Sequence, residues 1–227
     1  MSLTTDLRLS LRSALAEVLA EVLAGGGVDS AHDLGHADRV WSNARAIAIG
    51  EGHDPSPALM AAAYLHDLVS LPKDHPDRAR SASLSAEAAG PVMEALGLSA
   101  MDIATARHAI EAHSWSGGIE PRTPEARILR DADRLEALGA IGIARCFAVS
   151  GALRRRIVHP DDPFAGGRPL DDGAAALDHF QTKLLRLPEG MLTATGRRMA
   201  DERAATMRRW LADLAGELGQ TLPDAWT

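Results

Sequence analysis

Apolar residues recur at helical spacing along most of this chain, and this period constrains its fold more than any other feature. The clearest stretch stops at three glycines, 25–27, and its apolar side consists of Leu7, Leu11, Leu15, Val18, Leu19, Val22 and Leu23. No segment of any length shows the alternation typical of a β-strand. Alanine and leucine supply much of the 46% hydrophobic share, and aromatic residues only 4%, which favours helices. We therefore predict an all-α fold.

Capping residues and prolines set the expected helix boundaries. We expect loops at 71–80 and 157–173, and a continuing apolar segment, a candidate seventh helix, around Gly139 and Gly142. We interpret the chain, residues 1–227, as a single domain with a core at about 30–145 and a C-terminal helical extension at about 172–216. Besides 7–23, helices are expected at about 33–50, from 56 through 66, at 83–96 and 99–114, from 123 through 133, and at 174–187 and 193–216.

Charge and composition exclude several classes of protein. The formal net charge of -7 argues against a general nucleic-acid binder, which normally has a basic face. Cys146 is the only cysteine, so neither an intrachain disulfide nor a cysteine-rich zinc site is expected. Asp6 and Arg8 interrupt the early apolar residues, and no run reaches the roughly 20 apolar residues that span a bilayer. We expect a cytoplasmic protein without a membrane partner.

Several expected helices place a histidine or an aspartate on an otherwise apolar face. Buried carboxylates are costly unless they are paired or bind a metal. Imidazole and carboxylate together suit Mn, Mg, Co, Ni, Fe or Zn, and a helical bundle can bring such side chains to one centre. A single histidine on an apolar face is more often an ordinary core residue, and periodicity does not choose between Asp131 and Asp133. The candidates are His36, His66 with Asp67, His113, and either Asp131 or Asp133.

Longer motifs surround these candidates. They resemble the HD superfamily of metal-dependent phosphohydrolases, and in particular a bacterial subgroup of it. The resemblance runs over about residues 30–210 and implies an HD-domain helical bundle with additional C-terminal helices. The matching segments are Ala31–Val40, Tyr64–Asp67, Glu111–Ser114, Asp131–Gly142, Asp162–Phe164, Arg168–Leu170 and His179–Leu185.

The resemblance implies one divalent metal ion held by His36, His66, Asp67 and Asp133. The last ligand of the family is the aspartate directly before the arginine at position 134, which favours Asp133 and leaves Asp131 a supporting or structural role. Asp67 and His113, which matches a family histidine near the site, are the candidate catalytic residues. His108 lies off the apolar face of its helix, so we expect it to be exposed or structural.

The segment after the His-Asp pair departs from several nucleotidase relatives, which carry a catalytic acidic residue there. Here the first carboxylate is Asp74, so that general acid or base is not carried over. The same segment offers Lys73, Arg78 and Arg80 as candidate contacts to substrate phosphate, since charge-assisted contacts hold phosphate oxygens well. A solvated charged loop is an equally good interpretation of these three residues.

The function implied is metal-dependent hydrolysis of a nucleotide or related phosphorylated metabolite, with nucleoside triphosphate pyrophosphohydrolysis among the expected reactions. One alternative is an iron-dependent oxygenase on the same fold, which normally needs further histidine ligands for a second metal. Another is a non-catalytic nucleotide-binding regulator. Metal content and oxygen consumption would separate the first alternative from the hydrolase, and retained nucleotide without turnover would favour the second. A homodimer is compatible with the sequence.

Overall fold

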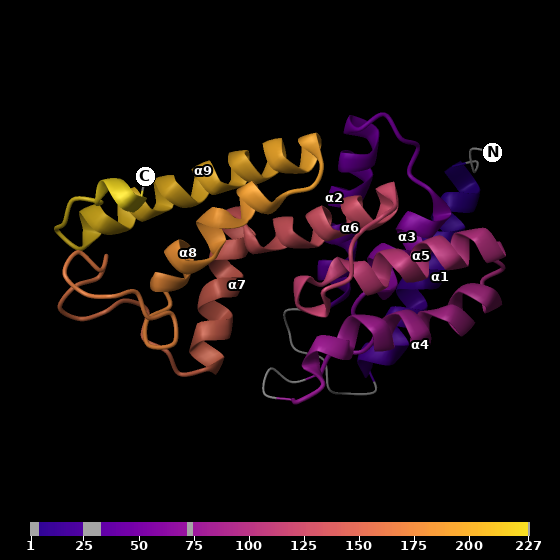
Figure 1. Ribbon diagram of the computed structural model, residues 1–227, viewed down its shortest axis with the longest axis horizontal. Coiled ribbons are helices and arrows are strands. Elements are labelled where there is room, and N and C mark those ends of the chain that lie inside the picture. The colour runs from indigo at the N-terminus through magenta and orange to yellow at the C-terminus, as the bar shows by residue number, and fades with distance from the viewer. Residues whose placement is uncertain (1–4, 25–32, 72–74, 227) are drawn as a thin grey trace. The chain divides into compact units, whose positions relative to one another are not determined.

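The computed structural model describes residues 5–24, 33–71 and 75–226, and these are organised by helices (Figure 1). The extended pairing within these ranges is an isolated parallel bridge between Arg156 and Ala175. The all-α prediction is confirmed. No single described helix is long and apolar enough to cross a membrane, although Pro124–Ala137 and Gly139–Ala152 together pass that test of length and composition. The chain divides into two compact units, Met1–Asp133 and Arg134–Thr227.

The first unit begins its helices where the sequence offers caps. Asp33, Ser56 and Ser99 each accept a hydrogen bond from the backbone N–H three residues later, as the sequence predicts. The interpretation of residues 1–227 as a single domain stays a prediction. The elements of this unit are α1 (Thr5–Ala24), α2 (Leu34–Gly50), α3 (Pro57–Leu65), η1 (Arg78–Arg80), α4 (Ser81–Ala95), α5 (Ala100–His113), η2 (Trp115–Gly117) and α6 (Pro124–Arg134).

Helix α3 lies at the centre of the first unit. Every residue from Ala58 to Leu65 is buried, because this helix is apolar all round. It packs against α1, α2, α4 and α5, and Figure 1 shows it close to α2 and α5. The chain that leaves its C-terminal end therefore starts from the interior of the unit.

A hydrogen-bonded group joins α1, α2 and α3. The Arg12 side chain donates through Nε to the Tyr64 hydroxyl at 2.9 Å and through Nη2 to Asp38 Oδ1 at 2.5 Å. The Tyr64 hydroxyl donates to the same Asp38 oxygen. Burial, followed by the neighbouring Asp38 carboxylate, raises the pKa of Tyr64, so the phenol keeps the proton that it donates. The group fixes α2 and α3 two residues away from His36 and His66.

The helix bounds correct the sequence prediction in three places. Helix α3 ends at Leu65, so His66 follows the helix instead of lying on its face. Helix α4 starts at Ser81 and is preceded by the turn η1, within the predicted loop. The helix predicted over 174–187 is wrong: α8 covers only Asp178–Thr182. The Arg156 N–H donates to the carbonyl of Ala174, and the Ala176 N–H donates to the carbonyl of Arg156. These hydrogen bonds hold residues 174–176 in the bridge, which competes with helix formation.

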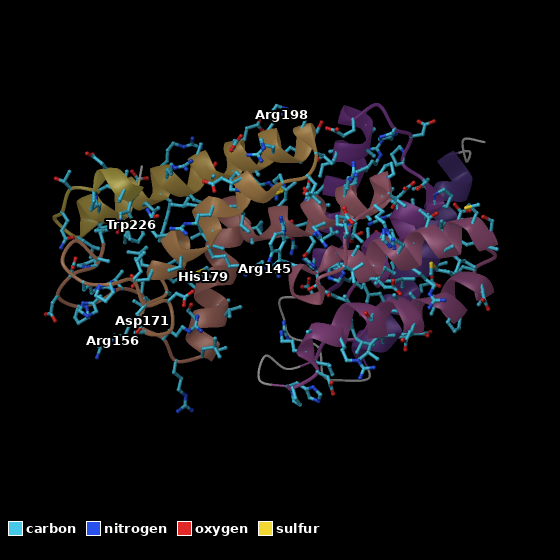
Figure 2. All side chains as sticks on the ribbon, in the orientation of Figure 1. Arg145, Arg156, Asp171, His179, Arg198 and Trp226 are labelled. Carbon is cyan, nitrogen blue, oxygen red and sulfur yellow. The ribbon has the colours of Figure 1, made fainter. Side chains whose placement is uncertain are left out.

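The second unit has an aromatic core and a buried ion pair. The rings of Phe147, Phe180 and Trp210 lie 5.4–6.1 Å apart between centroids. Arg168 donates to both oxygens of the fully buried Asp178, at 2.5 and 2.8 Å. Near the C-terminus, the Trp226 indole, labelled in Figure 2, donates to a backbone carbonyl. The elements are η3 (Leu135–Ala137), α7 (Gly139–Ala152), α8, η4 (Leu184–Gly190), α9 (Ala194–Glu217) and η5 (Asp224–Trp226).

Candidate metal centre

The four predicted metal ligands converge inside the first unit. His36 comes from the first turn of α2, His66 and Asp67 follow α3, and Asp133 lies near the end of α6. His36 Nε2 is 3.3 Å from His66 Nε2 and 3.5 Å from Asp133 Oδ1. His66 Nε2 is 3.2 Å from Asp67 Oδ2. Segments far apart in the sequence thus bring two imidazoles and two carboxylates to one point.

The spacing of these donor atoms fits a single ion. Ligands at about 2.1 Å from a metal lie about 3.0 Å apart at right angles and about 3.4 Å apart at a tetrahedral angle. The remaining contacts, His36 Nε2 to Asp67 and His66 Nε2 to Asp133, are 3.8 Å each. Donor atoms of His36, His66 and Asp67 all lie within 4.8 Å of one another. The cluster is therefore chemically and geometrically suited to a divalent cation.

Hydrogen bonds fix which nitrogen of each histidine faces the centre. His66 Nδ1 lies 3.0 Å from the carbonyl of Ala63, and His113 Nδ1 lies 2.6 Å from that of Ile110. A carbonyl oxygen only accepts, so Nδ1 carries the proton in both rings. Their Nε2 atoms are then directed to the cluster, and backbone partners of this kind hold metal-binding histidines in position.

The charged groups of the cluster shift one another's pKa values. Burial lowers the pKa of His66, but attraction by Asp67 and Asp133 outweighs burial and raises it to about 9. Burial acts to raise the pKa of Asp133, yet His66 and His36 outweigh it and the net direction is downward. Burial and the charge of His66 lower the pKa of His113, which favours its neutral form. A bound cation would take the place of the proton on His66 as the partner of the carboxylates.

The turn after α3 lets His66 and Asp67 face one point. Adjacent residues on a helix point about 100° apart, but here the helix has ended. Val69 N donates to Ser85 Oγ at 3.0 Å, and that hydroxyl donates back to Val69 O at 3.3 Å. Ser85 is fully buried in α4. Ser85 is not among the predicted site residues, because nothing local in the sequence indicates this contact across 16 residues.

The structure also separates the two aspartates of α6. Asp133 Oδ1 lies in the cluster, whereas Asp131 is fully buried and lies two residues, or about 200°, away around the helix. The Asn43 amide donates to the carbonyl of Ala132 at 3.3 Å, directly before Asp133. Asn43 was missed, although its position seven residues after His36 places it on the same face of α2. It ties the last ligand segment to the first.

The remaining predicted residues have different outcomes. Arg78 and Arg80 lie exposed on η1; Arg78 donates to the carbonyl of Leu71, and Arg80 lies 3.8 Å from Asp77. Lys73 lies outside the described residues. Phosphate contacts by these three stay a prediction. His108 accepts a hydrogen bond from Arg122 N at 3.1 Å, which agrees with the structural role expected for it.

An all-helical unit with converging His, His-Asp and Asp side chains defines the class of HD-domain proteins. The family model described as HD domain matches residues 33–138. The Bacillus subtilis protein YpgQ is 32% identical over 193 residues, which cover 83% of this chain and 85% of YpgQ. The chain belongs to the HD-domain family.

Solved structures extend the likeness beyond the residues matched by the family model. The crystal structure of Bacillus subtilis YpgQ in complex with ADP has a TM-score of 0.68 at 30% identity, covering 93% of this chain and 96% of YpgQ. An HD-superfamily hydrolase from Bacillus thuringiensis has a TM-score of 0.72 at 27% identity, covering 94% of this chain and 98% of that one. The fold is thus that of HD-superfamily hydrolases.

Proposed function

We propose that this chain is a metal-dependent phosphohydrolase that acts on a nucleotide or a related phosphorylated metabolite. The convergence of His36, His66, Asp67 and Asp133 beside His113 is the observation that carries the proposal. A divalent ion held by the first four would polarise a phosphoryl oxygen and lower the pKa of bound water. Pyrophosphate release from a nucleoside triphosphate is one reaction of this class.

His113 and Asp67 are the residues that we expect to take part in proton transfer. Asp67 Oδ2 faces His66, whereas Oδ1 lies 3.7 Å from His113 Nε2. Because its pKa is lowered, His113 is neutral near pH 7, and its Nε2 is free of the proton held at Nδ1. It could therefore accept a proton at Nε2 from the attacking water and return it to the leaving oxygen, while the Asp67 carboxylate stabilises the charged ring.

Cationic side chains supply the proposed phosphate contacts. A guanidinium has five N–H donors, so Arg78 keeps donors available beyond the one that binds Leu71. Arg80 lies within the same turn, and Lys73 precedes them in the sequence. The ADP complex of YpgQ, a relative with 30% identity, supports a nucleotide as the substrate of this chain.

Turnover with defined metals tests the proposal. Protein stripped by a chelator would be reloaded separately with Mn, Mg, Co, Ni, Fe or Zn, and phosphate and pyrophosphate release measured across phosphorylated metabolites. We expect release by the wild type and by Asp213→Ala, a control for removal of an exposed carboxylate, and none by Asp67→Ala. Metal-loaded wild type that releases neither product from any substrate would overturn the proposal. Substrate-dependent oxygen consumption with iron would instead favour the oxygenase.

A further inference from the structure

Two serines of α4 hold the chain that leaves the metal centre. The Ser85 hydroxyl accepts from Val69 N at 3.0 Å and donates to Val69 O at 3.3 Å. A hydroxyl can both donate and accept, so Ser85 satisfies the N–H and the carbonyl of the same residue. Ser81 Oγ accepts from Leu71 N at 3.4 Å. The segment 69–71 is therefore attached to α4 at two points.

The spacing of the two serines matches the spacing of the backbone groups that they bind. Ser81 and Ser85 are four residues apart, so they lie on one face of α4 and about 6 Å apart along its axis. Val69 and Leu71 are two residues apart, which is at most about 7 Å of chain. Both attachments can therefore form at once, with the chain after the metal ligands running antiparallel to the helix.

Asp67 depends on this attachment more than His66 does. The His66 ring is 1% exposed, so packing surrounds it, whereas the Asp67 side chain is 25% exposed and follows the end of α3. Its carboxylate faces two partners, because Oδ2 lies 3.2 Å from His66 Nε2 and Oδ1 lies 3.7 Å from His113 Nε2. Val69 is two residues further on, so its attachment to Ser85 limits how far the turn can move.

We propose that Ser85, assisted by Ser81, is the positioning residue that keeps the Asp67 carboxylate between the metal ion and His113. The inference rests on the proposed function and identifies the part of the fold that sets the geometry of its site. Ser85 acts through the backbone of Val69 and not on the ion itself. Loss of its hydroxyl would let the turn after α3 shift, so that one carboxylate oxygen could no longer bind the ion while the other faces the imidazole.

Binding of Mn(II) and Co(II) to the metal-free full-length protein tests the positioning role without requiring turnover. Calorimetric titration with Mn(II) gives the dissociation constant, and the visible absorption of bound Co(II) reports the geometry of its ligands. We expect Ser85→Ala to bind Mn(II) about ten- to a hundredfold more weakly, with a changed Co(II) spectrum, and Ser81→Ala to show a smaller loss. Ser85→Thr keeps the hydroxyl and should restore most of the affinity, although its extra methyl group should lower the urea midpoint.

Ala89→Gly is the matched control for a loss of stability within α4. Ala89 is fully buried one helical turn beyond Ser85, on the same face. Glycine weakens a helix, so this substitution should lower the urea midpoint without removing a hydroxyl that binds residues 69–71. We expect it to keep the Mn(II) affinity and the Co(II) spectrum of the wild type.

Other results overturn the inference. Wild-type affinity and spectrum in Ser85→Ala would make the role of Ser85 purely structural, and an equal loss in Ala89→Gly would attribute the weaker binding to lower stability. If Ser85→Ala does not fold, Ser81→Ala decides, and wild-type affinity and spectrum in that variant would overturn the inference. Failure of the proposed function gives a different result: weaker metal binding by Ser85→Ala, with no phosphate or pyrophosphate release by the wild type, would support positioning while contradicting the hydrolase.

Discussion

Replacement of Asn43 by alanine tests whether the contact between α2 and α6 positions the last metal ligand. The Asn43 amide is buried and donates to the carbonyl of Ala132, the residue before Asp133. Its loss should reduce the free energy of unfolding by about 1–3 kcal/mol, because a buried acceptor loses a donor. Groups that orient metal ligands typically contribute 10- to 100-fold to metal affinity, so we expect a weakening of roughly that size.

The control for Asn43→Ala is Ile47→Val on the same face of α2. This change removes one buried methylene, without removing a polar contact to α6, and should cost about 0.5–1.5 kcal/mol of stability. Denaturant unfolding of the metal-free proteins gives the stability, and competition with a chromogenic chelator gives the metal dissociation constant. If Asn43→Ala and Ile47→Val bind metal equally well, Asn43 contributes to stability only and the positioning argument is refuted.

Further expectations concern the site and its supports. Asp67→Ala should lose both bound metal and turnover, and full metal occupancy in this variant would contradict the ligand assignment. Asp131→Ala should keep the metal, as metal analysis would show. It should also lose about 1–3 kcal/mol of stability in denaturant unfolding. Either Arg78→Ala or Arg80→Ala should lower kcat/KM about ten- to a hundredfold at unchanged metal content, and wild-type values for both would remove η1 from the phosphate site. Tyr64→Phe should lower the free energy of unfolding by about 1–3 kcal/mol, because its hydroxyl joins α1, α2 and α3; an unchanged urea midpoint would refute this.

Local signals in the sequence predict most helix starts. Asp33, Ser56 and Ser99 act within a few residues of themselves, so neither packing nor distant contacts need be known. The helix predicted over 174–187 does not form as one element, because the backbone at its start pairs with Arg156. Arg156 lies some 20 residues away, and nothing in the sequence around it indicates this pairing. Competition between local helix preference and long-range hydrogen bonds is not visible in residue periodicity.

Some residues of the candidate site could be predicted from the sequence, and others could not. Resemblance to known motifs selected Asp133, and the structure places it with the histidines, whereas periodicity alone left Asp131 as an equal choice. Asn43 and Ser85 were not predictable as supports, because each hydrogen bond joins segments that only the folded chain brings together. An ordinary polar residue on a helix gives no indication of which distant carbonyl or N–H it will meet.

His66 and His113 also cap the C-terminal ends of helices α3 and α5. The carbonyls of Ala63 and Ile110, which accept from His66 and His113, belong to the last turns of α3 and α5, where carbonyls have no helical partner. Replacing either ring by alanine thus removes a helix cap together with a functional nitrogen, and a lost activity would not say which one mattered. Asparagine places its amide near the Nδ1 position and glutamine near the Nε2 position. Paired substitutions would therefore separate the contribution of each imidazole to chain architecture from its contribution to chemistry.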